Sequence, residues 1–281
     1  MVDNQLFDRE SLRADCVSCA GLCCTALAFS ASTDFAYDKA AGEPCKNLQR
    51  DFRCSIHDKL LRSGFKGCAA FDCYGAGQQV TQQTFGGRDW ISQPEIAQKM
   101  FRTLPVMIEL HEMLWYLIEA MEMACPEPLQ DGLERQFSEI NSLTGLAADD
   151  LITLDTIALR NTVRPLLTQA GQHMQKASKK SKADKDFRGK QLMGTDFKGA
   201  NLVNADFTGA YLIAANCRMA DFSKANLLGA DLRDADISGA DLTESLFLAQ
   251  NQTNSAIGDS RTKLPAHINR PSHWAKGQRN F

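Results

Sequence analysis

The sequence lacks a strong excess of either charge. Lys and Arg number 31 and Asp and Glu number 34, so the formal net charge is −3 over 281 residues. A near-neutral chain has no global attraction to nucleic acid or to an anionic membrane. We therefore expect neither of them as a partner.

The sequence also lacks an apolar leader and an uncharged hydrophobic run. It begins MVDNQLFDRESLR, which is polar and acidic and argues against secretion. The longest apolar-rich run, 105–124, predicts a buried helix rather than a membrane span because charged and titratable residues interrupt it: Glu109, His111, Glu112, Glu119 and Glu122. We expect a cytoplasmic protein, and in that compartment dense cysteines more often bind metal or perform redox chemistry than form disulfides.

Catalytic motifs are a third absence. We find no nucleophile elbow, no HExxH and no paired-carboxylate motif, and YGAGQQ after Cys73 lacks the GK[ST] ending of a phosphate loop. These observations predict a protein that is not an enzyme. His57 and Asp72 are the residues to test for a metal enzyme, because a catalytic zinc keeps an open coordination position.

What the sequence does contain is a repeat of five residues from 185 to 249. Thirteen consecutive pentads align without an insertion, and Ala stands two positions before the central residue in nine of them, from residue 200 to residue 240. Asp or Asn lies between the two in ten pentads. The central residues predict the core of this region: Phe187, Leu192, Phe197, Leu202, Phe207, Leu212, Cys217, Phe222, Leu227, Leu232, Ile237, Leu242 and Phe247.

A period of five excludes an α-helix, because at about 100° per residue the central side chains would spiral around it. One corner per pentad instead closes a square coil after about four pentads, with coils roughly 4.8 Å apart. Gly ends six pentads and suits the turn. The pattern resembles the pentapeptide-repeat family, which implies a right-handed quadrilateral β-helix, here of about three coils. The alternative, a low-complexity linker, does not explain thirteen units in phase.

Residues 1–90 predict a metal-stapled domain. They hold eight of the ten cysteines and few aliphatic residues, and Cys16 and Cys19 have the spacing of a metal knuckle. A structural zinc contributes on the order of 10 kcal/mol of folding free energy, which would compensate for the small core. We expect one or two zinc ions, or alternatively an iron–sulfur cluster; free thiols and disulfides remain open. The candidate ligands are Cys16, Cys19, Cys23, Cys24, Cys45, Cys54, Cys68 and Cys73, with His57 as a mixed ligand.

The succession C-x2-C-x3-CC, PC-x-N-L and C-x-I-H resembles bacterial cysteine-cluster domains that chelate zinc or iron. The resemblance implies ligand positions at Cys16, Cys19, Cys23, Cys24, Cys45, Cys54 and Cys68. The extra residue before Cys23, and Cys73 beyond the pattern, leave the ligand sets open. The cysteine-rich head before a pentapeptide tail is also similar to bacterial resistance proteins of the oxetanocin-A type, which implies self-protection against a nucleoside antibiotic.

The remaining segments predict helices and caps. We expect a helical bundle over 91–180, with helices at 94–104, 105–124 and 129–143 and one or two between 148 and 178. The helix 105–124 is apolar beyond a single face, which favours the centre of the bundle over a dimer contact. The bundle should cap the start of the solenoid. The lysine-rich segment 176–190 is a solvated linker. The tail 250–281, with His267, Trp274 and Phe281, would cap the other end or form a homodimer contact.

The sequence as a whole predicts a mixed fold and a non-enzymatic protein that binds a protein or a drug. One alternative is a thiol-based redox or metal sensor, supported by the adjacent Cys23 and Cys24. A second is a DNA mimic that protects a topoisomerase. The repeat region opposes the mimic, because it carries nine acidic and seven basic residues on only about three coils.

Overall fold

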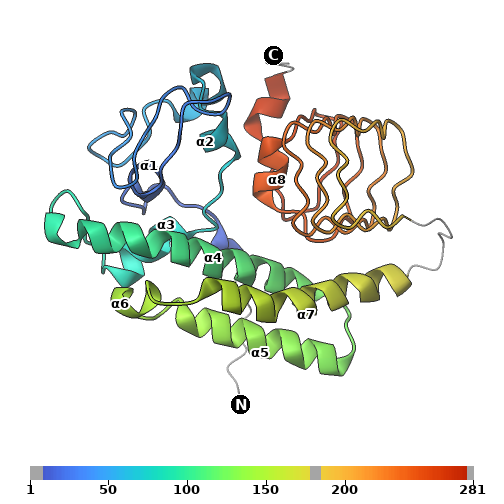
Figure 1. Cartoon of the computed structure of the whole chain (residues 1–281), viewed down its shortest axis with the longest axis horizontal. Helices are drawn as coiled ribbons and strands as arrows, with labels where there is room; N and C mark the ends of the chain where they lie inside the picture. Colours follow the sequence, from blue (N-terminus) through green and yellow to red (C-terminus); the bar gives the residue numbers. More distant parts are fainter. Residues whose placement is uncertain (1–8, 178–184, 277–281) are drawn as a thin grey trace. The chain divides into compact units, whose positions relative to one another are not determined.

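A computed structural model describes residues 9–177 and 185–276 (Figure 1). The chain divides into two compact units, Met1–Cys68 with Asp72–Ala170, and Ala69–Phe71 with Gly171–Phe281. The first unit holds the cysteine-rich region and most of the helical region, and the second holds the repeats. Residues 178–184 of the predicted linker and the predicted cap residue Phe281 lie outside the described residues.

The cysteine-rich region contains only short helical segments. They are η1 (Arg9–Leu12), α1 (Leu22–Ala26), η2 (His57–Lys59), η3 (Leu61–Ser63), α2 (Lys66–Ala70), α3 (Ala76–Gln78) and η4 (Gln79–Thr84). The expected helical piece near residues 56–63 consists of two 3₁₀ turns separated by Leu60. Between these segments the chain is held by turns and isolated bridges, so it depends on side-chain packing for its shape.

Helix α4 (Ala97–Glu122) is the core of the first unit. Its side chains at Met100, Leu104, Met107, Leu110 and Leu117 are completely buried, which confirms the prediction of a central helix. The expected boundary at Pro105 is wrong. Only the 3₁₀ turn η5 (Pro94–Ile96) precedes α4, and the helix continues through Pro105. The lost hydrogen bond and ring clash cost about 3 kcal/mol, which burial of the flanking apolar residues offsets.

Three further helices complete the bundle: α5 (Glu127–Leu143), α6 (Ala148–Leu151) and α7 (Thr156–Ala177). Leu133, Phe137 and Ile140 form the buried stripe of α5. On α7, Arg160 pairs with Glu109 and with Glu112 of α4, the second at 2.8 Å. Within the described residues no helix is long and apolar enough to cross a membrane.

The second unit is a four-sided solenoid (Figure 1). Parallel bridges join residues 20 apart, as in Asp186↔Asp206↔Asn226 and Gln191↔Tyr211↔Asp231, so four pentads complete one coil as predicted. The pairing remains a set of isolated bridges, and the described part of the chain contains no continuous strand. Corners follow one another too closely for a strand to extend. The predicted central residues are buried from Leu202 to Phe247, whereas Phe187, Leu192 and Phe197 of the first coil are half-buried.

The corners explain the two small residues of the repeat. Gly at the end of six pentads has φ between 62° and 69°, the left-handed region that glycine enters without strain. Ala two residues before the centre is buried, with eight such alanines between 205 and 240 exposed by 4% or less. A larger side chain at this position would have no space inside the coil.

The solenoid continues past Phe247 with a different local structure. Helix α8 (Gln250–Ser255) is inserted, and the chain then returns to pair at Asp236↔Ile257 and Asp241↔Lys263. Gln252, at a central position where an apolar residue was expected, is buried. Its side chain accepts the N–H of Ala249 at 2.7 Å and donates to the carbonyls of Leu227 at 2.9 Å and Ala230 at 2.8 Å. A polar residue therefore closes the apolar core.

The tail beyond this added coil also covers the solenoid. Trp274, in η6 (Ser272–Lys276), is buried and donates its indole N–H to the carbonyl of Ala256 at 3.1 Å. A Cβ at Gly258 would lie 2.6 Å from the Trp274 ring, so the ring packs directly on the backbone there.

The end of α7, from Gly171 onwards, belongs to the second unit. These last turns of α7 lie along one side of the solenoid. A Cβ at Gly171 would lie 2.6 Å from the Asn226 side chain and 3.3 Å from Phe247, and Gln175 donates to the carbonyls of Asn204 and Ala205. Asn226, Leu246 and Leu248 stand in outward positions that carry charges in other pentads, and all three are uncharged and buried.

Candidate functional site

The N-terminal cysteines are positioned by tight turns of the backbone. Asp15 accepts the N–H of Val17 at 2.9 Å and the hydroxyl of Ser18 at 2.6 Å, which fixes the turn between Cys16 and Cys19. Gly21 has φ 64° and starts α1, which carries Cys23 and Cys24. The sequence C-x2-C-x3-CC therefore folds into a turn followed by one helical turn.

Two later segments return to this helix. The N–H of Cys45 donates to the carbonyl of Cys24 at 2.8 Å, so Cys45 lies beside the end of α1. An antiparallel bridge, Leu48↔Cys54, then brings Cys54 back alongside the segment that follows Cys45. Cysteines far apart in the sequence are thus gathered in one region.

Cys16, Cys19 and Cys73 form the first thiol group. A Cβ at Gly77 would lie 2.7 Å from Sγ of Cys19 and 3.9 Å from Sγ of Cys73, so both thiols pack over the same glycine. Burial raises the pKa of Cys16 to about 11, and the charges of Cys23 and then Cys19 add to it. Burial likewise raises the pKa of Cys19 and of Cys73 to about 11.

Cys45, Cys54 and Cys68 form the second thiol group. The buried Sγ of Cys45 lies 3.1 Å from the Tyr37 hydroxyl. Burial raises the pKa of Cys68 to about 12, and charges on Cys45 and Cys54 contribute. Stacked and edge-on rings of Phe29, Phe35, Tyr37 and Phe65 pack behind this group.

A recurring backbone contact marks four of these thiols. The N–H of Asn47 lies 3.5 Å from Sγ of Cys45. Backbone N–H groups lower the pKa of three other thiols against the larger effect of burial: Leu22 and Gly21 act on Cys19, Ile56 on Cys54, and Gly77 and Gly75 on Cys73. An N–H aimed at sulfur stabilises the thiolate over the thiol, and such bonds accompany thiolate ligation of metals. The pattern occurs in both thiol groups.

Cys23 is adjacent to Cys24 on α1. Its Sγ is 3.9 Å from Sγ of Cys24, and that contact, followed by burial, raises the pKa of Cys23 well above the ordinary value. The charge of Cys23 also raises the pKa of five other thiols, in each case after burial. They are Cys16, Cys19 and Cys73 of the first group and Cys54 and Cys68 of the second.

The donor set suits a thiophilic metal, but the thiols are not closed around one. All ten cysteines are free thiols. In the described ranges no three Cys, His, Asp or Glu side chains converge tightly enough to hold an ion as they stand. Two observations make these cysteines suitable for a metal ion. Backbone N–H groups stabilise the thiolates, and the thiolates would repel one another without a cation. A bound cation would relieve the repulsion between these thiols once they ionise.

Sequence reasoning missed Lys39, which is 5% exposed. Its ammonium donates to the carbonyls of Thr25 at 3.0 Å, Ala40 at 3.1 Å and Glu43 at 2.8 Å. It is close enough to Cys23, Cys24 and Cys45 for their charges to raise its pKa, although burial acts more strongly and lowers it. A single lysine in a loop belongs to no sequence pattern, so the buried position of Lys39 could not be predicted.

The remaining candidate residues, His57, Asp72 and Cys217, lie outside the two thiol groups. The side chain of His57 is 69% exposed, and its nearest ionic partner is the adjacent Asp58 at 3.9 Å. Asp72 accepts the N–H of Tyr74 at 2.9 Å, and burial raises its pKa; its charge acts on Cys16 and Cys73. Cys217 is in the solenoid core, where burial raises its pKa to about 12.

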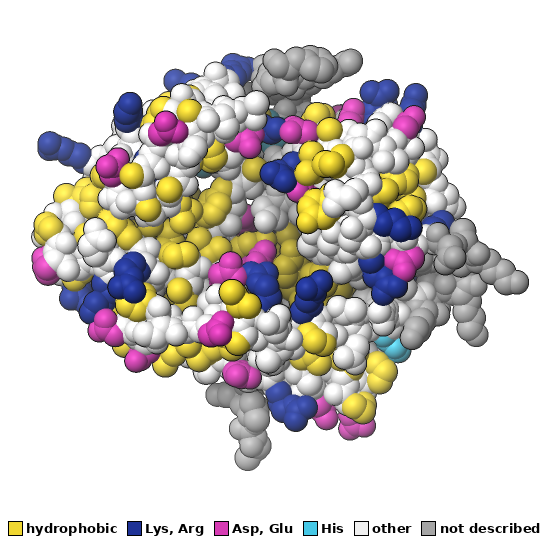
Figure 2. Space-filling view, in the orientation of Figure 1, with side chains coloured by type: hydrophobic (Ala, Val, Ile, Leu, Met, Phe, Trp, Pro, Cys, Tyr) yellow, Lys and Arg dark blue, Asp and Glu magenta, His cyan; other side chains and the backbone are white. Residues whose placement is uncertain are grey.

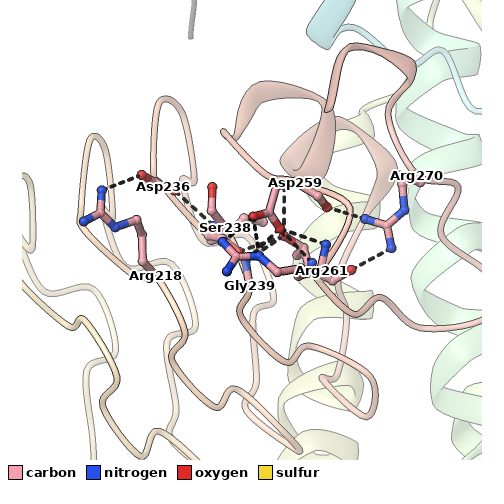
Figure 3. Close-up of polar contacts among 9 residues, drawn as sticks. Arg218, Asp236, Ser238, Gly239, Asp259, Arg261 and Arg270 are labelled. Carbon is pink, nitrogen blue, oxygen red and sulfur yellow. Dashed lines mark hydrogen bonds and ion pairs between the residues drawn. The ribbon is translucent and has the colours of Figure 1, made fainter. Parts of the chain in front are cut away.

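The outer surface of the solenoid carries charges of both signs, interspersed on the visible face (Figure 2). Several are committed to local contacts (Figure 3). Arg218 lies 3.6 Å from Asp236, and Arg261 pairs with Asp259 at 2.7 Å. Asp259 also accepts the N–H of Gly239, while Arg270 donates to the carbonyls of Asp259 and Thr262. The bond from Gly239 to Asp259 fastens the added coil to the stack, and the three arginines are held in local contacts rather than forming an open anion site.

The coiled pentads define the class: this is a pentapeptide-repeat protein. The family described as Pentapeptide repeats matches residues 191–227 and 220–247, with eight copies. The chain is 53% identical over 273 residues to the Bacillus subtilis (strain 168) protein named "Uncharacterized protein YybG", with 97% of each chain covered. It belongs to the same family as that protein.

One solved structure also resembles the repeat region. It is the crystal structure of a pentapeptide repeat protein from the Arabidopsis thaliana thylakoid lumen, with 37% sequence identity and a TM-score of 0.26. The match covers 28% of this chain and 55% of that one.

Proposed function

We propose that this protein is a non-enzymatic metal-binding protein whose pentapeptide solenoid binds a protein or a small-molecule drug. The observation that carries the metal binding is the gathering of cysteines from distant segments, with Cys19 and Cys73 packed over Gly77 and the N–H of Asn47 lying 3.5 Å from Sγ of Cys45. A backbone N–H beside a sulfur stabilises the thiolate, and thiolates are the ligands of zinc and of iron–sulfur clusters. The bound metal would stabilise a region with few apolar residues.

Elemental analysis of the purified full-length chain, together with its visible spectrum, tests this proposal. A colourless protein with one or two zinc ions per chain is the expected result; a brown protein with iron and sulfide would indicate the cluster instead. Cys45→Ser should lower the metal content, whereas Cys217→Ser, which changes a thiol of the solenoid core, should not. Wild-type protein without stoichiometric metal would contradict the proposal.

We place the interaction on the solenoid because its outward side chains include exposed apolar residues beside the charges. Met193, Tyr211 and Met219 are 59%, 43% and 54% exposed. A nucleoside antibiotic is one candidate ligand, through the resemblance to oxetanocin-A resistance proteins. Drug susceptibility of cells that express the wild type or the Cys45→Ser variant measures this part, and equal susceptibility with and without the wild-type protein would reject it.

A redox sensor is the second candidate, favoured by the 3.9 Å contact between the sulfurs of Cys23 and Cys24. The raised pKa of Cys23 opposes it, because the thiolate is the reactive species. Counting free thiols before and after mild peroxide distinguishes the two. Unchanged thiol number and metal content would remove the sensor.

A further inference from the structure

The first coil of the solenoid leaves one edge of its backbone open. In later coils the residue before each centre bonds to the preceding coil through both of its backbone groups, as Asp206 donates its N–H to the carbonyl of Lys185 and accepts the N–H of Phe187. The first coil has no coil before it, and in the part of the chain that the structure describes no bond is made to the corresponding groups. The residues whose N–H and carbonyl both lie on this open edge are Asp186, Gln191, Asp196 and Asn201.

The apolar core also ends at this edge. Phe187, Leu192 and Phe197 are half-buried, whereas Phe207 and Leu212 one coil later have no exposed surface. The ring of Phe187 stacks on that of Phe207 with centroids 4.7 Å apart, and the ring of Phe197 meets that of Phe187 edge-on at 5.7 Å. Aromatic surface that is covered inside the stack is therefore partly exposed at its start.

The other end of the solenoid is closed in the described part of the chain. There α8 is inserted, and the buried side chain of Gln252 occupies the next central position. Trp274 packs on the backbone at Gly258. A second copy can therefore stack only first coil against first coil, which gives a closed two-fold dimer rather than an open filament.

We propose that two copies of this chain associate through the open edges of their first coils, related by a two-fold axis. The rotation sets the facing segments of the two copies antiparallel. In an antiparallel ladder, a residue with both backbone groups on the edge exchanges two hydrogen bonds with the residue opposite. All four edge residues meet this condition, so the edge is complementary to itself. The inference is independent of the proposed metal binding.

The pitch of the coil selects the register. A coil climbs by one strand spacing, about 4.8 Å, in each turn, so its open edge is a ramp. Two such ramps stay evenly spaced around the turn only when the two-fold axis passes through the corner between the Gln191 and Asp196 sides. This axis sets Gln191 opposite Asp196 of the second copy, and Asp186 opposite Asn201 of the second copy. Each carboxylate then faces an amide, and no two like charges oppose one another.

Sedimentation equilibrium of the full-length chain over a range of concentrations tests this dimer. The wild type should approach twice the 31.0 kDa of one chain. Gln191→Asp introduces the residue that other pentads carry at this position, as at Asp206, and sets it against Asp196 of the second copy. The two carboxylates repel each other, so the dissociation constant should rise about tenfold. Gln191→Asn has the same shape as that variant without the charge and should remain dimeric.

A charge exchange tests the register. Gln191→Asp combined with Asp196→Asn restores a carboxylate–amide pair and should recover the wild-type dissociation constant. Asp196→Asn retains the acceptor for the N–H of Lys198, so the coil should keep its fold, which thermal unfolding of each variant verifies. A wild-type chain that stays monomeric, or equal weakening by Gln191→Asp and Gln191→Asn, would overturn the dimer interface. Failure of the exchange to restore the dimer would overturn the register.

Discussion

At the scale of single residues, His111 shows how burial sets a charge state. It lies on α4, is 4% exposed, and its Nδ1 is 2.6 Å from the carbonyl of Tyr74. Burial lowers its pKa from 6.5 to about 4, so the folded chain holds a neutral imidazole that donates to that carbonyl. The charged form is available mainly to the unfolded chain.

The His111 pKa predicts a loss of stability in acid. As pH falls from about 6.5 towards 4, the unfolded chain binds a proton that the folded chain does not, which removes up to about 3 kcal/mol. Above pH 6.5 the contribution is fully present. Urea unfolding at pH 7, 5.5 and 4.5 should show a shallower pH dependence for His111→Gln than for the wild type, while the exposed His57→Gln should match the wild type. Parallel wild-type and His111→Gln profiles would contradict the assignment.

Gly77 gives a second prediction at this scale. It lies in α3 with ordinary helical φ, so alanine suits its backbone, but the added Cβ would lie 2.7 Å from Sγ of Cys19. We expect Gly77→Ala to cost about 1–3 kcal/mol of unfolding free energy and to lower metal content. Gly132→Ala in α5 is the control, because its Cβ meets only the movable end of Leu166 at 3.2 Å. If chemical denaturation shows the same loss of unfolding free energy for both variants, the contact with Sγ of Cys19 does not contribute to stability.

At the scale of elements, the end of the solenoid departs from its own repeat. Leucine at position 252 would restore the apolar centre of the pattern, yet we expect Gln252→Leu to be destabilising. It removes one acceptor for the N–H of Ala249 and two donated bonds to buried carbonyls, a loss of about 1–3 kcal/mol. Thermal unfolding should show a lower midpoint than for Leu242→Met, a conservative change at a regular centre. A Gln252→Leu midpoint above that of the wild type would show that the apolar core continues through position 252.

The regular elements could be predicted from the sequence because their environments repeat. Each solenoid centre meets the same neighbours one coil away, so five-residue periodicity alone identifies the core from Leu202 to Phe247. The apolar run of α4 likewise indicates a buried helix. Irregular contacts gave no such signal. Neither the three carbonyls around Lys39 nor the course of the chain through Pro105 follows from a local pattern.

The cysteine region was predicted only in part for the same reason. The spacing of Cys16 and Cys19 indicates a turn, and the sequence identifies which thiols are candidates. Their division into groups depends on where the loops return, as when Cys45 meets the end of α1 through a single backbone bond.

At the scale of the whole molecule, cysteines of two kinds lie in two separate compact units. The eight in the head are exposed or partly buried, apart from the buried Cys45, and are candidate ligands; Cys217 is completely buried in the solenoid. Bound metal should protect the head cysteines from thiol reagents, and tight packing should protect Cys217. Removing the metal therefore ought to change the reactivity of the head cysteines alone.

We expect a chelator to increase labelling of the head cysteines by a thiol reagent at least tenfold, while Cys217 stays unlabelled because its side chain has no exposed surface and burial raises its pKa to about 12. Peptide mass spectrometry after timed labelling at pH 7 measures each cysteine separately. Cys217 should become labelled only in denaturant, and Gln252→Leu should lower the concentration required. Labelling of Cys217 at the same rate as the head cysteines after chelation would show that the solenoid loses its structure together with the metal-bound head.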